Sequence, residues 1–153
     1  MEKFSASMIK ATTETLEYMA FLEVLPASGN VCLPPEEEAL SSALLIHDPI
    51  QGELRLLMPK TLLGEICETV YAMPQEELAD SVPADLLAEI LNTIAGRLLD
   101  ELIPDETFRL GLPDVKEGWQ IFDDSASRIW YFTAEARPFA IIAEGETLLK
   151  AFA

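Results

Sequence analysis

The chain has 153 residues, 50% of them hydrophobic, which is enough apolar material for the core of one domain. Its formal net charge of -17 repels polyanions, so we expect neither nucleic acid nor a membrane surface as a partner. The N-terminus is too polar for a signal peptide, and no apolar run approaches the roughly 20 residues of a membrane span. We therefore expect a single cytoplasmic domain over residues 1–153.

The two cysteines, Cys32 and Cys67, are far apart and form no CxxC pair. This spacing is unlike a metal site or a secreted disulfide framework. We expect two buried thiols in a reducing compartment rather than a disulfide.

The first half of the chain predicts a helix, a hairpin and a second helix. Apolar residues recur every three or four positions over residues 8–24, which predicts a helix. Two apolar runs, 42–48 and 52–59, flank a turn with proline and glycine and predict an antiparallel hairpin. Helical spacing returns over residues 60–73 and ends at Pro74. The acidic run of Glu36, Glu37 and Glu38 is expected to be a solvated loop.

The second half begins with a long amphipathic helix and then changes to strand patterns. The helix "DLLAEILNTIAGRLLDEL" covers residues 85–102 and is entered at Ser81 or at Val82 and Pro83. Apolar runs predict strands over 107–113, 119–124, 127–136 and 137–145, and a short helix over 146–153. This order predicts an α+β fold, in which antiparallel sheet packs against two long helices and shorter ones.

The helix over residues 85–102 carries an unusual polar face. At 100° per residue, one broad apolar arc is expected to be buried, and it contains Leu86, Leu87, Ile90, Leu91, Ile94, Leu98 and Leu102. Asp85, Glu89, Asn92 and Gly96 fall together on the opposite side. Glycine inside a helix costs about 1 kcal/mol relative to alanine, so Gly96 needs a reason.

Two interpretations of this polar face remain open from the pattern alone. In the first, it is an ordinary solvated face and Gly96 packs against a neighbouring element. The pattern alone favours this interpretation, because an E-x-x-N pair at helical spacing is common by chance. In the second, the missing side chain at Gly96 lets another surface approach the backbone beside Asn92.

The segment "AEILNTIAG", residues 88–96, resembles the E-x-x-N-x-x-x-G signature of the CheC/CheX/FliY phosphatases, which dephosphorylate the chemotaxis response regulator CheY. The resemblance extends over residues 10–132, from the helix "TTETLEYMAFLEV" through the hairpin and the second helix to the later strands. It implies the CheC/CheX-like fold. The first helix reads Glu14-Thr15-Leu16-Glu17 and has no asparagine, so a single site of CheX type is implied.

The resemblance also implies roles for the residues of the polar face. Asn92 would enter the active site of a phosphorylated CheY-like receiver domain and orient the attacking water. Glu89 would pair with a lysine of that partner, and Asp85 and Gly96 would contact it. Mg²⁺ would be supplied by the response regulator, so we expect no metal or cofactor of the chain's own. Family members include dimers formed through sheet edges, so we also expect a homodimer.

Two alternatives remain beside the phosphatase interpretation. One is a non-catalytic module of the same fold, which binds a receiver domain or itself without turnover. The other is an unrelated α+β scaffold with an accidental E-x-x-N.

For the other candidate residues, the sequence favours structural roles over functional ones. The single histidine, His47, is expected at a strand end, and Asp123 and Asp124 are expected in a hairpin turn rather than around a cation. Aromatic residues in the late strands are expected in the core or a dimer face: Trp119, Trp130, Tyr131 and Phe132.

Overall fold

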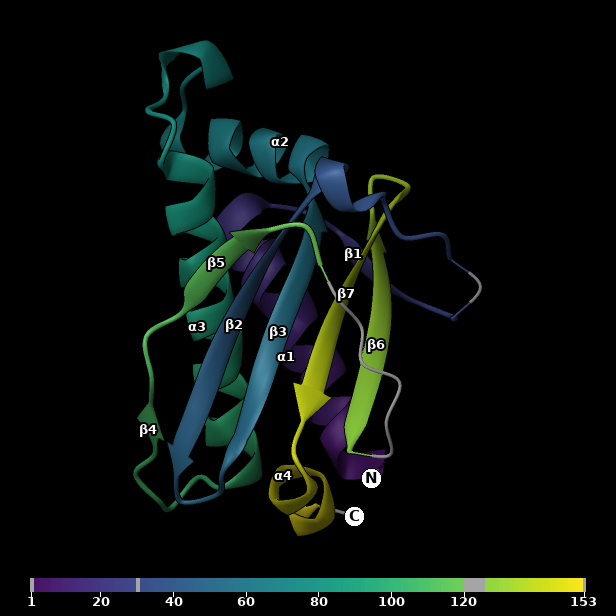
Figure 1. Ribbon diagram of the computed structural model, residues 1–153, viewed down its shortest axis with the longest axis vertical. Coiled ribbons are helices and arrows are strands. Elements are labelled where there is room, and N and C mark those ends of the chain that lie inside the picture. Colours follow the sequence, from purple (N-terminus) through teal and green to yellow (C-terminus); the bar gives the residue numbers. More distant parts are fainter. Residues whose placement is uncertain (1, 30, 120–125, 153) are drawn as a thin grey trace.

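The computed structural model describes residues 2–29, 31–119 and 126–152, which form one seven-stranded antiparallel sheet with helices on one face (Figure 1). The strand order is β1-β6-β7-β3-β2-β4, and β5 also pairs with β2. The helices are α1 (Glu2–Ala20), α2 (Lys60–Tyr71), α3 (Val82–Leu102) and α4 (Glu146–Ala151), with short 3-10 turns at Glu36–Glu38 and Gln75–Glu77. The strands are β1 (Val24–Ala27), β2 (Ala39–Asp48), β3 (Gly52–Pro59), β4 (Arg109–Leu110), β5 (Asp114–Glu117), β6 (Ser127–Ala134) and β7 (Arg137–Glu144). The predicted α+β class is confirmed.

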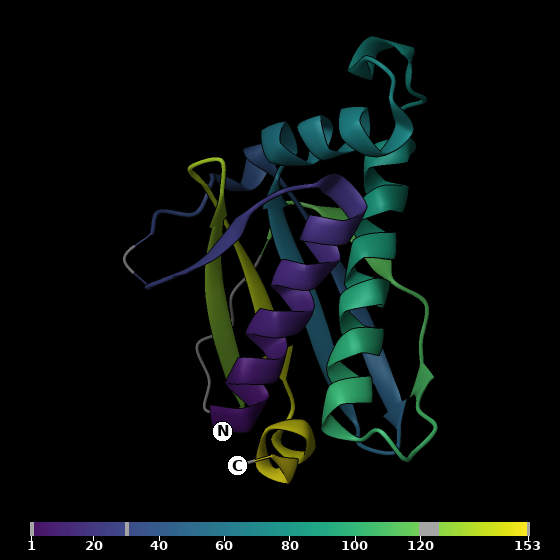
Figure 2. The same ribbon diagram turned by 180° about the vertical axis from the view of Figure 1, so that it is seen from behind.

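The core lies between the sheet and the two long helices. Figure 2 shows α1 and α3 side by side over one face of the sheet, with α2 crossing one end of this layer. All seven residues of the predicted apolar arc of α3 are buried, and Ala95 and Leu99 join them. The sheet contributes alternate side chains of β2, β3, β6 and β7 to the same cluster, among them Leu44, Leu56, Phe132 and Ile141. Burial of one face therefore fixes how α3 is rotated about its axis.

The hairpin and the second helix were predicted correctly within a few residues. Strands β2 and β3 pair in register from Ala39↔Pro59 to Ile46↔Gly52. Helix α2 begins at Lys60 but ends at Tyr71, two residues before the predicted end, because Ala72 adopts a left-handed conformation. His47 lies half-buried near the end of β2, as expected of a structural residue.

The predicted bounds of the first helix were wrong at both ends. Helix α1 starts at Glu2 and stops at Ala20, where Phe21 takes a left-handed conformation with φ 55° and its N–H donates to the Glu17 carbonyl. Such a backbone costs an L-residue about 1–2 kcal/mol. Val24, predicted as helical, instead begins β1, which pairs with β6 as an edge strand. Its Pro26 is tolerated because an edge strand needs fewer amide donors.

The late strands differ from prediction before β6. The predicted strand over 107–113 shrinks to the two residues of β4, and the polar segment of β5 forms an unpredicted strand beside β2. The acidic run at Glu36–Glu38 is a 3-10 turn rather than a loop, although it is exposed as expected. Of the strand predicted over 119–124, residues 120–124 lie outside the described residues, and so do Asp123 and Asp124.

The aromatic and cysteine predictions were confirmed only in part. Trp130 and Phe132 are buried in the core, with Trp130 stacked on Phe4. Cys67 is a buried free thiol in α2, and its burial raises its pKa. Cys32 was predicted to be buried but is an exposed free thiol, because it lies in the connection between β1 and β2 rather than against the core.

Candidate functional site

The outward face of α3 presents the residues singled out in the sequence. Asp85, Glu89 and Asn92 are exposed, and Gly96 is half-buried, all on the side of the helix that faces away from the sheet. Asp85 lies in the first turn, where its charge is favourable with respect to the helix dipole. The predicted polar face therefore exists on one continuous, solvent-facing stripe.

Local sequence keeps this stripe regular. Proline in the first turn suits the start of α3, and the buried arc of leucine and isoleucine residues anchors the helix along its whole length. The hydroxyl of Thr93 donates to the Glu89 carbonyl oxygen at 2.8 Å, so this side chain is held against the helix beside the stripe. Glu89 and Asn92 are thus carried by a rigid element.

Gly96 does not pack against a neighbouring element. A Cβ placed at this residue would meet no atom within 4 Å. The interpretation that Gly96 makes room for another part of the fold is therefore wrong. The glycine instead leaves a bare stretch of helix open to solvent, one turn beyond Asn92, where a second molecule can reach the backbone.

The electrostatics of the stripe leave its functional groups available. Among the described residues, no ion pair to the Glu89 carboxylate and no hydrogen bond to the Asn92 amide is found. Two other acidic residues of the helix layer are paired: Lys10 binds Glu101 at 3.3 Å, and Arg97 binds Glu14 at 3.2 Å. An exposed carboxylate beside an amide can bind a cationic group and orient a water molecule.

Arg97 belongs to this face although the sequence interpretation did not include it. Its guanidinium lies 5.1 Å from the centre of the Tyr18 ring and is bonded to Glu14, so it bridges α3 to α1. The signal that could have found it is simple: Arg97 is the single basic residue in α3 and directly follows Gly96.

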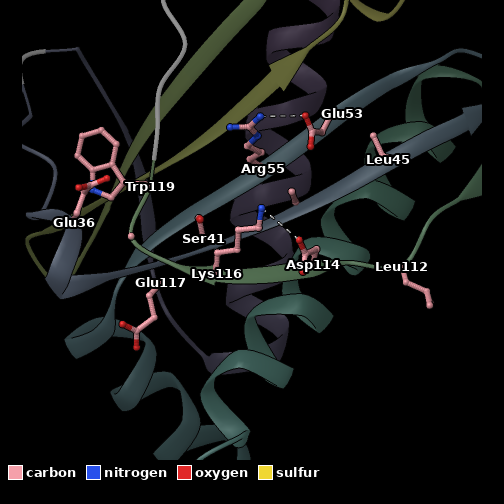
Figure 3. A pocket seen from close by; sticks show the side chains of 12 residues that line it. Glu36, Ser41, Leu45, Glu53, Arg55, Leu112, Asp114, Lys116, Glu117 and Trp119 are labelled. Carbon is pink, nitrogen blue, oxygen red and sulfur yellow. Dashed lines mark hydrogen bonds and ion pairs between the residues drawn. The ribbon is translucent and has the colours of Figure 1, made fainter.

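A hollow of about 500 Å³ lies on the helix-free face of the sheet (Figure 3). Its two basic side chains are paired: Arg55 binds Glu53 and Glu144, and Lys116 binds Asp114. Within the described ranges, no group of three histidine, cysteine, aspartate or glutamate side chains could hold a metal ion. No helix of the described chain is long and apolar enough to cross a membrane.

Shifted pKa values occur where α2 meets the β6–β7 turn. Glu65 of α2 is bonded to Arg137 at 2.7 Å, and this guanidinium lowers the pKa of the Glu65 carboxyl group. The neighbouring Glu65 raises the pKa of Glu135. These three groups join α2 to the β6–β7 turn, so a structural role accounts for them.

Comparison with known proteins identifies relatives of the same architecture. Residues 40–129 match the model of the family described as "Chemotaxis phosphatase CheX". The chemotaxis protein CheX from Vibrio vulnificus superposes with a TM-score of 0.75 at 19% identity, covering 92% of this chain and 95% of that one. A CheC-like superfamily protein from Shewanella gives 0.73 at 19%, covering 93% and 96%.

A third solved structure contains a partner. It is a CheX-CheY-BeF3-Mg complex from Borrelia burgdorferi, which matches with a TM-score of 0.68 at 13% identity over 92% of this chain and 96% of that chain. A search of curated protein sequences gives no significant match.

Proposed function

Since the chain belongs to the CheX family of chemotaxis phosphatases, we propose that it accelerates hydrolysis of the aspartyl phosphate of a CheY-like response regulator. The observation that carries this proposal is the stripe on α3, where a carboxylate without an ion pair among the described residues, an exposed amide and a bare glycine occur together. The Borrelia CheX bound to CheY supports a receiver domain as the partner.

The proposed reaction does not require a strong base from this chain. An aspartyl phosphate is an activated acyl phosphate, so its hydrolysis mainly needs a water molecule in line with the leaving oxygen. The amide of Asn92 has a donor and an acceptor that can hold such a water molecule. Asn92 is exposed on a convex helix face, so it can enter the active site of another protein. In this proposal Asn92 positions the nucleophile and does not act as a base.

Glu89 fixes the orientation of the complex. It precedes Asn92 by three residues, so the two side chains lie on one side of the helix. Its carboxylate is exposed and would pair with a lysine of the receiver, which orients Asn92 toward the phosphoryl group. Asp85 lies one turn further toward the start of α3 and would contact the rim of the partner.

Mg²⁺ belongs to the partner in this mechanism. The ion neutralises charge on phosphoryl oxygens and is usually held by one or two carboxylates together with the phosphate itself. A receiver domain provides those groups around its own phosphoaspartate, and this chain contributes the amide and the docking carboxylate.

The decisive experiment measures phosphate release from a purified, phosphorylated CheY-type receiver domain with and without this protein. Wild type is expected to accelerate release. Asn92→Ala is expected to lower the maximal rate at least about 10²-fold while binding is retained, because the water loses its orientation. Glu89→Lys is expected to raise KM, because it would repel the partner's lysine.

Asp100→Ala provides the matched control. Asp100 is an exposed acidic residue of the same helix, two turns beyond Asn92, and its removal should leave both the maximal rate and KM unchanged. Binding of receiver domains without acceleration by wild type would replace the phosphatase by a non-catalytic binding module.

A homodimer through the sheet edges stays a prediction. Strand β1 ends the sheet on one side, and β4 and β5 end it on the other; their free edges are the surfaces available for pairing with a second copy. Light scattering during size-exclusion chromatography tests this, and a clean monomer at micromolar concentration would contradict it.

A further inference from the structure

The end of α1 carries two aromatic side chains that are largely exposed. Phe21 is 83% exposed and Tyr18 is 64% exposed. Phe21 also has a left-handed backbone, a conformation in which glycine is favoured and a bulky side chain is penalised. An exposed aromatic side chain that gains no packing while its backbone is strained contributes little to stability, so a role outside folding accounts for it.

The packing of α1 against α3 places these aromatic residues beside the signature stripe. Lys10 binds Glu101, and Glu14, one turn later in α1, binds Arg97, one turn earlier in α3. The two helices are therefore antiparallel. One further step of four residues brings Tyr18 to the level of Thr93 along the helix axis.

The same step places the aromatic end of α1 level with the carboxylate of the stripe. Phe21 directly follows the last residue of α1, Ala20, so its backbone lies close to the level of Glu89 along the axis. Both helices turn their outer faces to the same side of the molecule (Figure 2).

Arg97 joins the two halves of this surface. Its guanidinium lies over the Tyr18 ring and is half-exposed while it is bonded to Glu14. A guanidinium has five N–H donors, so donors remain for an incoming acidic group. Arginine and exposed aromatic residues are the side chains most often found as binding hot spots.

We propose that Tyr18, Phe21 and Arg97 form a second docking element for the phosphorylated receiver domain, adjacent to Glu89 and Asn92. This inference rests on the proposed function. Phe21 and Tyr18 bury their rings against an apolar part of the receiver, while Arg97 pairs with a carboxylate at the rim of its phosphorylation site. That site must gather carboxylates to hold the phosphoaspartate and Mg²⁺, so a cation next to Gly96 complements it.

Charge supports the role given to Arg97. The chain has 27 acidic and 10 basic residues, so the carboxylates around a phosphorylation site are repelled over most of the surface. Arg97 is the one basic residue of α3 and lies beside the stripe that carries Glu89 and Asn92. It would offset this repulsion locally and fix how the receiver approaches.

The test uses Phe21→Gly, a substitution that should separate docking from folding. Glycine relieves the left-handed strain, so the melting temperature is expected to stay the same or rise. Loss of the aromatic anchor is expected to raise KM for the phosphorylated receiver about tenfold, with the maximal rate unchanged. A structural role for Phe21 would instead lower the melting temperature and leave KM unaltered.

Arg97→Met tests the polar half. Methionine retains an unbranched apolar side chain, but the substitution removes the charge. The KM for the phosphorylated receiver is therefore expected to rise several-fold and to depend less on salt concentration. Leu112→Ala is the matched control, because Leu112 is 93% exposed and lies on the opposite face of the sheet (Figure 3), so KM should not change.

A direct binding titration distinguishes this inference from the phosphatase proposal. The probe is a CheY-type receiver domain held in its phosphorylated-like state with beryllofluoride and Mg²⁺. Binding weakened by Phe21→Gly supports the docking element even if wild type does not accelerate hydrolysis. Equal affinity of Phe21→Gly and wild type overturns the docking element while the activity of Asn92 stands. A wild-type protein that binds no receiver overturns both.

Discussion

Helices α1 and α3 lie side by side on the same face of the sheet but differ on both their buried and their exposed sides. The buried face of α3 is entirely apolar, whereas α1 buries three hydroxyl residues, Ser7, Thr12 and Thr15. On the exposed side, Glu14 of α1 is bound by Arg97, while Glu89 of α3 has no ion pair within the described ranges.

This difference shows that exposure on a helix surface is not sufficient for a signature carboxylate to bind a partner. The carboxylate must also be free of ion pairs with other residues of the fold. By this measure α3 is suited to binding a cationic group of a partner, and α1 supports α3 with its own ion pairs. Substitutions in each helix can break or sharpen this contrast.

The largest effect is expected from the apolar face of α3. Leu98 is fully buried, so Leu98→Ala removes apolar contacts and leaves a cavity, which should lower the free energy of unfolding by about 2–5 kcal/mol. Urea denaturation followed by circular dichroism measures this. Asp100→Ala, two residues away on the exposed side, should change the value by less than about 0.5 kcal/mol. Similar effects of both substitutions would contradict the assigned burial of α3.

A smaller effect of opposite sign is expected in α1. The Thr15 hydroxyl is buried and finds no hydrogen-bond partner in the described structure. Thr15→Val replaces it by a methyl group of similar size, so the free energy of unfolding should rise by about 1–2 kcal/mol. Denaturant titration of the two proteins measures the change. A loss of stability would show that the hydroxyl has a partner that this structure does not contain.

Much of this contrast was predictable from sequence, because it depends on periodicity. The apolar arc of α3, the β2–β3 hairpin and the exposed stripe all follow from the spacing of apolar residues. Burial of Ser7 and Thr15 in α1 was less visible, because these hydroxyl residues are compatible with either face of a helix.

Tertiary contacts between distant segments were not predictable from local pattern. The short strand β1 exists because β6 provides hydrogen-bond partners for it, and β5 exists because β2 does so. The bridge from Arg97 to Glu14 and Tyr18 depends on the antiparallel packing of two helices that are far apart in the sequence. The candidate stripe was found because all its residues lie within one helix. The proposed docking element of Tyr18, Phe21 and Arg97 was missed because its residues come from two separate segments, the end of α1 and α3.

A more modest effect on stability, with a clear effect on docking, is expected at Gly96. Since its Cβ would meet open space, Gly96→Ala should raise the free energy of unfolding by about 0.5–1 kcal/mol through helix propensity alone. The added methyl group should nevertheless raise KM for the receiver, because the partner can no longer approach the backbone as closely. Thermal denaturation and phosphate release measure the two effects. An unchanged KM would show that the partner does not approach Gly96.

The smallest effect is expected from copying the signature into α1. Glu17 is exposed and follows Glu14 by three residues, so Glu17→Asn would reproduce in this helix the spacing of Glu89 and Asn92. We expect no new activity, measured as phosphate release in the Asn92→Ala background. A lysine of the receiver that approached Glu14 would meet the guanidinium of Arg97, which already occupies this carboxylate at 3.2 Å. The ion pair between Arg97 and Glu14 is weak because it is half-exposed. Docking is prevented by repulsion between the lysine and the Arg97 guanidinium rather than by the strength of this ion pair. Rescue of activity by Glu17→Asn would show that α1 can dock a receiver despite Arg97, and that spacing alone defines the site.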